Sequence, residues 1–229
     1  MELENSVKKA DEVADDDRIE LPSDTLAILN EFLRSKSMQE SMETDHSNFE
    51  EDWQLSQFWY DENTIRLLSE VCSKLILHRH QSTPSSQIKI ALLSCPSLYK
   101  SVKAVHPNGV VRLFEFDNRF SVFGDDFVFY DYKDKERNET SLKDYENHFD
   151  ILIADPPFLS QECIEPIANI VKRLKKEDSK IIMCSGQTAA GWIKTFLELN
   201  QCEFRPGHER NLANEFCSYA NFDLDNFVR

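Results

Sequence analysis

From residue 87 onward the chain alternates short apolar runs with helical patterns, and this alternation most restricts the folds open to it. We predict strands over 87–94, 110–117, 127–131, 149–154 and 179–184, with two more near 201–204 and 215–222. We predict helices over 62–80, 97–105, 160–175 and 188–199, and a short one within 133–147. Several strands are too apolar to keep one face in water, which is typical of a mostly parallel sheet covered by helices on both faces. The sequence therefore predicts an α/β domain.

The first 52 residues differ from the rest of the chain in charge. They hold 16 acidic and 5 basic residues, in a chain whose formal net charge is -15. We expect residues 1–52 to form an acidic, partly disordered arm with one short helix from about Leu21, and residues 53–229 to form the folded domain. Such an arm favours a basic partner through long-range attraction, or it only keeps the protein soluble.

Cysteine spacing and hydropathy argue against several classes of protein. The six cysteines are scattered without a Cys-x-x-Cys pair, which predicts reduced thiols and no metal site. The N-terminus lacks the apolar core of a signal peptide, and no run approaches the ~20 apolar residues of a membrane span. Phosphate backbones require a surface rich in Lys and Arg, and none is visible in this acidic chain. We therefore expect a cytoplasmic protein with neither a membrane nor a nucleic-acid partner.

The most specific motif is Asp155-Pro156-Pro157-Phe158, which follows the predicted strand 149–154. Each proline lacks an N–H donor and holds the residue before it extended. The turn therefore presents carbonyl groups and the Asp155 carboxylate without competing donors. That arrangement suits a ligand amine, and Phe158 adds an aromatic wall. We take Asp155, Pro156 and Phe158 as candidate catalytic residues; a plain turn in which Asp155 caps the next helix is the alternative.

Three acidic residues follow strands whose carboxyl ends meet at one edge of the predicted sheet, where ligands bind in such folds. Glu115 and Asp117 end the second predicted strand, and one of them is expected to accept hydrogen bonds from ribose hydroxyls. We favour Asp117, which is nearer the strand end. Asp131 ends the third predicted strand and could accept from an adenine amino group. Solvated acids at strand ends are the alternative for all three.

The loop after the first predicted strand, Ser94-Cys95-Pro96-Ser97, contains no glycine. This argues against the G-x-G-x-x-G motif of dinucleotide-binding proteins. The small side chains would still let a cofactor approach, so we count Ser94, Cys95 and Ser97 as candidate cofactor contacts.

An aromatic cluster, Phe58-Trp59-Tyr60, precedes the long helix predicted from about Glu62. These rings either anchor the start of that helix in the core or form a lid that walls a target amine. We count all three as candidate substrate contacts.

The chain carries five separated motifs: LSQFWYDE, VRLFEFDNRF, FVFYDY, FDILIADPPFLSQEC and RNLANEFCSYANF. Together, over about residues 53–225, they resemble the eukaryotic elongation factor 1-alpha lysine methyltransferases of the N6-adenine-methyltransferase-like type. The resemblance implies a class I methyltransferase fold, which is a Rossmann-like, mostly parallel sheet with an antiparallel C-terminal strand and helices on both faces. It also implies the cofactor S-adenosyl-L-methionine and a basic protein substrate, elongation factor 1-alpha. Asn214, in the last motif, becomes a candidate substrate contact.

The reaction implied is in-line transfer of a sulfonium methyl group to a lysine ε-amine. A lysine with a reference pKa of ~10.4 must first lose its proton, and desolvation in an aromatic pocket lowers that pKa. Two alternatives stay open. One is an adenine-N6 methyltransferase acting on nucleic acid, which the cradle at Asp155 would also serve. The other is a non-catalytic binding module that kept the fold but lost the cofactor with its glycine-free loop.

Overall fold

The computed structural model describes residues 49–82, 87–210, 212 and 215–228. Nearly all of them belong to one compact unit, Glu50–Arg229. A second unit, Met1–Phe49, contributes only Phe49 to the described part of the chain. The helix predicted in the acidic arm, and Asn214, lie outside the described residues.

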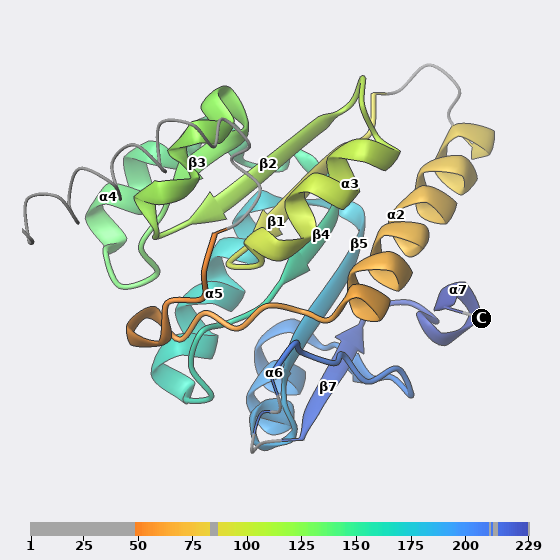
Figure 1. Ribbon diagram of the computed structural model, residues 1–229. Helices are drawn as coiled ribbons and strands as arrows, with labels where there is room; N and C mark the ends of the chain where they lie inside the picture. Colours follow the sequence, from red (N-terminus) through yellow and green to blue (C-terminus); the bar gives the residue numbers. More distant parts are fainter. Residues whose placement is uncertain (1–48, 83–86, 211, 213–214, 229) are drawn as a thin grey trace, which may run out of the picture. The chain divides into compact units, whose positions relative to one another are not determined.

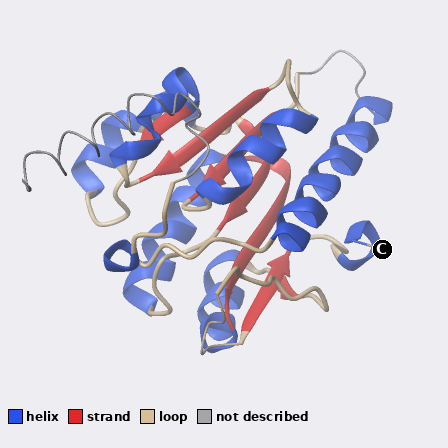
Figure 2. Cartoon of the chain, viewed as in Figure 1, coloured by secondary structure: helices blue, strands red, loops and turns tan. Residues whose placement is uncertain are grey.

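Seven strands form one sheet (Figures 1 and 2). They are β1 (Lys89–Leu93), β2 (Val110–Glu115), β3 (Phe127–Phe129), β4 (Phe149–Ala154), β5 (Lys175–Gly186), β6 (Asn200–Gln201) and β7 (Phe216–Ala220). Their order is β3-β2-β1-β4-β5-β7-β6. The first five strands run parallel, whereas β7 is antiparallel to both β5 and β6. The predicted class I methyltransferase-like sheet, with its antiparallel C-terminal strand, is confirmed.

Helices cover both faces of this sheet. On one face lie α2 (Glu62–Ser82) and α3 (Tyr99–Val105), and on the other lie α5 (Gln161–Leu174) and α6 (Ala190–Leu197) (Figure 1). The shorter helices are α4 (Lys135–Ser141) and α7 (Asp225–Val228). The part of the chain that the structure describes also contains five 3-10 segments: η1 (Trp53–Leu55), η2 (Pro96–Leu98), η3 (Asn118–Asp126), η4 (Lys143–Tyr145) and η5 (Gln187–Ala189). Among the described residues, every helix is too short or too polar to cross a bilayer.

The core follows from the alternation of side chains along the central strands. All six residues of β4 are buried, because β1 and β5 flank it and helices cover both of its faces. Leu152 and Ala154 belong to the cluster beneath α5 and α6. Ile151 and Ile153 alternate with them and therefore point to the face under α2 and α3. Truncating fully buried Leu152 to Ala would cost about 2–5 kcal/mol.

One difference from the predicted boundaries matters for the site. The second strand ends at Glu115, two positions before Asp117. Asp117 instead caps η3, a segment that the sequence pattern did not predict: its Oδ1 accepts a hydrogen bond from the Arg119 N–H at 2.9 Å. Phe120 of η3 is buried, so this segment packs as part of the domain.

Candidate active site

A cavity of about 630 Å³ lies at the carboxyl ends of the parallel strands, the edge where ligands bind in open α/β sheets. Most of its wall comes from residues 54–59, 94–97, 115–116, 130–133 and 155–159. His208, Leu212 and Phe216 complete the wall.

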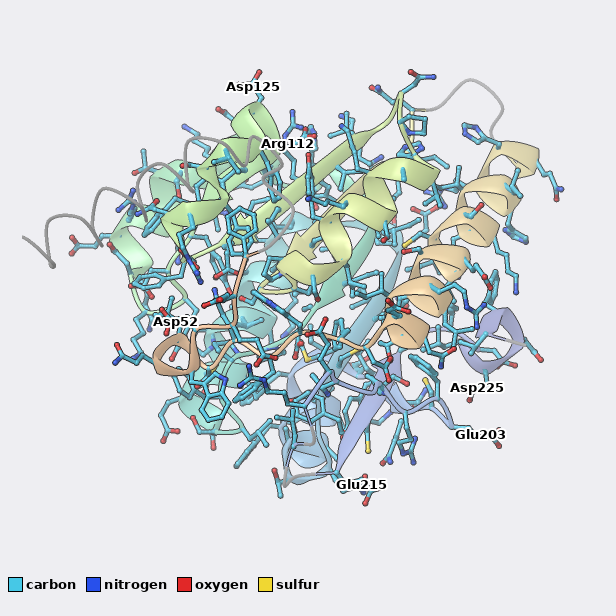
Figure 3. All side chains as sticks on the ribbon, in the orientation of Figure 1. Asp52, Arg112, Asp125, Glu203, Glu215 and Asp225 are labelled. Carbon is cyan, nitrogen blue, oxygen red and sulfur yellow. The ribbon has the colours of Figure 1, made fainter. Side chains whose placement is uncertain are left out.

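Residues 50–61, which we call the strap, run along the carboxyl-terminal edge of the sheet before α2 begins (Figure 1). Near its start, the Asp52 carboxylate caps η1 by accepting a hydrogen bond from the Gln54 N–H at 2.9 Å (Figure 3). At its end, the Asp61 N–H donates to the Gly207 carbonyl at 3.0 Å. Because the Glu50 carbonyl also accepts a hydrogen bond from the Arg119 guanidinium at 3.2 Å, the strap is tied to the rest of the domain near both ends. It forms one side of the cavity.

Asp155 lines the cavity directly after β4. Its N–H donates to the Leu93 carbonyl of β1 at 3.0 Å, which continues the pairing of these two strands. Asp155 is half-buried. This burial raises the pKa of Asp155 to about 7, while the Tyr60 hydroxyl beside it lowers the pKa and the Glu115 charge raises it. The Tyr60 hydroxyl is buried, and it makes no hydrogen bond of full geometry with any described residue.

The structure rules out the simpler interpretation of the Asp155 turn. The following helix, α5, begins only at Gln161, and Ser160 occupies its N-cap position. Asp155 therefore does not cap that helix. Pro156 is buried and Phe158 is 41% exposed, and both line the cavity with Asp155.

Glu115 lines the cavity, whereas Asp117 does not. Glu115 is 5% exposed, and its Oε1 accepts hydrogen bonds from the N–H groups of Phe116 (3.0 Å) and Asp117 (3.2 Å). Burial raises the pKa of Glu115 to about 7 despite those bonds. The Asp117 Oδ2 accepts from Gln57 Nε2 at 3.1 Å and from Arg119 Nε at 2.7 Å. The geometry thus favours Glu115 over Asp117 as the acceptor for ribose hydroxyls, and the role itself stays a prediction.

Ser94 turns the chain after β1 with a φ of 54°, in the left-handed region that favours glycine. Its N–H donates to the Phe114 carbonyl at 2.9 Å, and its hydroxyl lies 3.2 Å from the Tyr130 hydroxyl. The loop therefore makes the turn that a glycine would make elsewhere. Ser94, Cys95 and Ser97 all line the cavity, and their contact with a cofactor stays a prediction.

The residues after β3 form another side of the cavity. The Asp131 Oδ1 accepts a hydrogen bond from the Lys133 N–H at 2.9 Å. Lys133 Nζ lies 5.4 Å from the ring centre of Tyr132 and 6.0 Å from that of Phe158. No site role was predicted for Tyr132, although this residue ends the quoted motif FVFYDY. Lys133 was missed because a single basic residue after a short strand gives no motif signal.

The aromatic cluster divides into two parts. Phe58 and Trp59 line the cavity, whereas Tyr60 is 1% exposed and lies behind the wall. His208 and Phe216 lie in the same wall and were also missed. Phe216 falls within a quoted motif, but His208 lies between the last two predicted strands and outside every quoted motif.

The lining fits a cationic nucleoside cofactor. Three carboxyl groups line the cavity, from Glu115, Asp131 and Asp155, against one basic side chain, Lys133. Phe116 is 47% exposed and offers a flat apolar face to a base. This set suits ribose hydroxyls, an adenine ring, a sulfonium charge and an amine. Among the described residues, no three His, Cys, Asp or Glu side chains are grouped to hold a metal ion.

Known proteins resemble this chain over the residues that form the cavity. A family model described as "Probable N6-adenine methyltransferase" matches residues 51–224, which include the whole cavity wall. A protein-lysine N-methyltransferase of Drosophila melanogaster is 48% identical over 223 residues, covering 93% of this chain and 98% of that protein. EEF1A lysine methyltransferase 1 of Gallus gallus is 38% identical over 220 residues, covering 91% and 96%. The protein of the same name from Homo sapiens is 36% identical over 219 residues, covering 93% and 96%.

Proposed function

The chain belongs to the family of probable N6-adenine methyltransferases, and on this premise we propose that it methylates a lysine ε-amine of translation elongation factor 1A. The relatives named as protein-lysine N-methyltransferases, which align over nearly the whole chain, support this choice of substrate. S-adenosylmethionine, when bound, supplies the methyl group. The structural observation that carries the proposal is the turn at Asp155: a half-buried carboxyl group in the cavity wall, followed by two prolines that offer no competing donor.

Residues at the ends of β1, β2 and β3 would hold the cofactor. Glu115 would accept from the ribose hydroxyls and Asp131 from the adenine amino group. The small side chains of Ser94 and Ser97 leave room beside the first strand, and Phe116 offers a face for the base. Because Ser94 already adopts the left-handed turn, the missing glycine does not argue for a module that has lost its cofactor.

The lysine side of the cavity would bind and orient the amine. Phe58, Trp59 and Phe158 present apolar rings, which suit the methylene stem of a lysine and lower the pKa of its ammonium group by desolvation. The Asp155 carboxylate and the Pro156 carbonyl would accept hydrogen bonds from the nitrogen. Positioning supplies most of the acceleration in such a transfer, since a sulfonium is a good leaving group.

The charge of the chain favours a protein substrate over a nucleic acid. The chain carries a formal net charge of -15, and three carboxyl groups line the cavity against one lysine. Such a field repels phosphate backbones and attracts a basic protein. An elongation factor as substrate would also put the enzyme in the cytoplasm.

The test is mass spectrometry of elongation factor 1A, prepared without lysine methylation, after incubation with the enzyme and S-adenosylmethionine. We expect one or more lysines to gain 14 Da steps with the native enzyme and none with Asp155→Asn. Asp125→Asn, which changes an exposed acid outside the cavity (Figure 3), is the matched control and should remain active. Methylation of adenine in single-stranded nucleic acid, with an unmodified protein, would support the alternative activity and overturn this one.

A further inference from the structure

We infer that His208 accepts the proton that the target ammonium group must lose before methyl transfer, an inference that rests on the proposed function. His208 lines the same cavity as Asp155, Trp59 and Phe216. Among the described residues that line the cavity, His208 is the one histidine. The roles proposed for binding the cofactor and orienting the amine do not involve it.

The position of His208 is fixed by the strap. Its backbone forms a β-bridge with Tyr60, and the next residue, Glu209, donates its N–H to the Trp59 carbonyl at 2.9 Å. The imidazole packs between two rings, with centroids 5.2 Å from Tyr60 and 4.6 Å from Phe216. Tyr60 in turn holds its hydroxyl beside Asp155. One layer of rings therefore connects the imidazole with the cradle for the amine.

The imidazole is available to a ligand. Neither of its ring nitrogens takes part in a hydrogen bond with another described residue, although the ring is enclosed on two sides. Burial lowers the pKa of His208, so the neutral form, which can accept a proton, predominates at neutral pH. A neutral imidazole is the side chain most often used to accept a proton in enzyme reactions.

The charged groups around His208 oppose the effect of burial on its pKa. Asp61 and Glu51 of the strap raise the pKa of His208, which moderates the effect of burial. Glu51 is itself engaged, because it accepts a hydrogen bond from the Trp59 N–H at 2.9 Å and pairs with Arg210 at 3.2 Å. Phe216 carries no charge, and Tyr60 has a pKa raised by burial and stays protonated. Asp155, behind Tyr60, and Glu115, in the same cavity wall, both titrate near neutrality, because burial raises the pKa of each to about 7.

Charge assigns His208 to accept the proton and Asp155 to orient the amine. Asp155 orients the amine only while it is ionised, and a carboxylate that took the proton would lose that role. Transfer to His208 breaks one N–H bond of the ammonium and leaves a lone pair on the lysine nitrogen. That lone pair forms the new N–C bond while the C–S bond breaks and its electrons stay on sulfur. The imidazolium then releases its proton to solvent as the product leaves.

The test is the pH profile of single-turnover methylation by the full chain, with His208→Gln against His148→Gln. His148 is a matched control, since burial lowers its pKa too but it precedes β4 at the opposite edge of the sheet. We expect His208→Gln to slow transfer about 100-fold at neutral pH, with affinity for S-adenosylmethionine within a few-fold. The deficit should shrink as pH rises toward the pKa of free lysine, because solvent then removes the proton.

A second variant keeps the inference testable if glutamine disturbs the wall. His208→Ala should regain part of its lost rate when imidazole is added, and His148→Ala should not respond. A loss that is equal at all pH values and insensitive to imidazole would make His208 a wall residue and overturn the inference. A native enzyme that methylates no protein lysine at any pH would instead refute the proposed function.

Discussion

Gln57 of the strap and Asp117 at the start of η3 are joined by a hydrogen bond of 3.1 Å between two buried side chains. Arg119 completes the group: its guanidinium donates to Gln57 Oε1 at 2.9 Å and to Asp117 Oδ2 at 2.7 Å. Asp117, which the sequence favoured as the ribose acceptor, therefore holds the strap to the sheet edge. Its neighbour Glu115 is left facing the cavity.

This arrangement predicts that substitution of Glu115 lowers cofactor affinity, whereas substitution of Asp117 lowers stability. Glu115→Gln should weaken binding of S-adenosylmethionine about 10- to 100-fold, since hydrogen bonds to a charged group contribute about 1.5–3 kcal/mol. Asp117→Asn should lower the free energy of unfolding, because it weakens the ties to Gln57 and Arg119, and should change cofactor affinity less. Isothermal titration calorimetry with thermal unfolding measures both quantities. A larger loss of affinity in Asp117→Asn would return the ribose role to that residue.

Cofactor affinity should also depend on pH. Burial raises the pKa of Glu115 to about 7, so this carboxyl is largely protonated in the free enzyme at about pH 6 and ionised at about pH 8. Only the ionised form accepts two hydroxyl hydrogen bonds and favours a sulfonium charge. Affinity should therefore rise between those pH values. The rise should disappear in Glu115→Gln and persist in Asp155→Asn, and a rise that persists in Glu115→Gln would assign it to another group.

Asp155→Asn should change the pH dependence of stability. The pKa of Asp155 is about 7 in the folded protein, against an ordinary value of 3.8. The folded state therefore binds the extra proton between these values, and stability falls as pH rises through that range. Asparagine avoids the cost of ionising a buried carboxyl. The variant should thus melt several degrees above the native protein at about pH 8, and the difference should vanish toward pH 4. Equal melting temperatures at both pH values would show that the carboxyl is solvated.

Much of the fold could be predicted because its signals are local. The prediction for 149–154 has the bounds of β4, since a largely apolar run ends there at Asp155. The strand before Asp117 was predicted two residues too long. There the Asp117 side chain caps η3, and the backbone leaves the strand before it. The apolar pattern of the sequence alone does not show that this cap forms in place of two further strand residues.

The site was predictable where a motif implied its chemistry, as at Asp155 and the Ser94 loop. It was not predictable where the fold brings distant residues together. His208 follows Tyr60 by well over a hundred positions, and only the β-bridge between them puts the imidazole in the cavity wall. The choice between Glu115 and Asp117 depended in the same way on Gln57, which lies 60 positions from Asp117.

Ser94 allows a direct test of the glycine-free loop. Ser94→Gly should change the free energy of unfolding by no more than about 1 kcal/mol, because relief of the left-handed strain offsets the lost contact with Tyr130. Ser94→Val should destabilise by about 1–3 kcal/mol, since a β-branched side chain strongly disfavours a φ of 54°. Urea denaturation measures both. A valine variant as stable as the native protein would mean that the loop adopts another conformation in solution.

The last prediction concerns the acidic N-terminal arm. Residues 1–20 hold eight acidic and three basic residues. If the substrate is a basic protein, this charge should raise the rate of encounter through attraction that is screened over a Debye length of ~8 Å at physiological salt. Deleting residues 2–20 should therefore reduce kcat/KM for the protein substrate at low salt and leave kcat and cofactor affinity unchanged.

The salt dependence distinguishes steering from contact. The deficit of the deletion variant should shrink as salt rises, because screening removes the same attraction from the native enzyme. Replacing the eight acids by their amides is the matched control, since it removes the charge and keeps the length of the segment. That variant should reproduce the deletion at every salt concentration. A deletion that slows the reaction equally at all salt concentrations, while the amide variant behaves like the native enzyme, would mean that residues 1–20 contact the substrate directly.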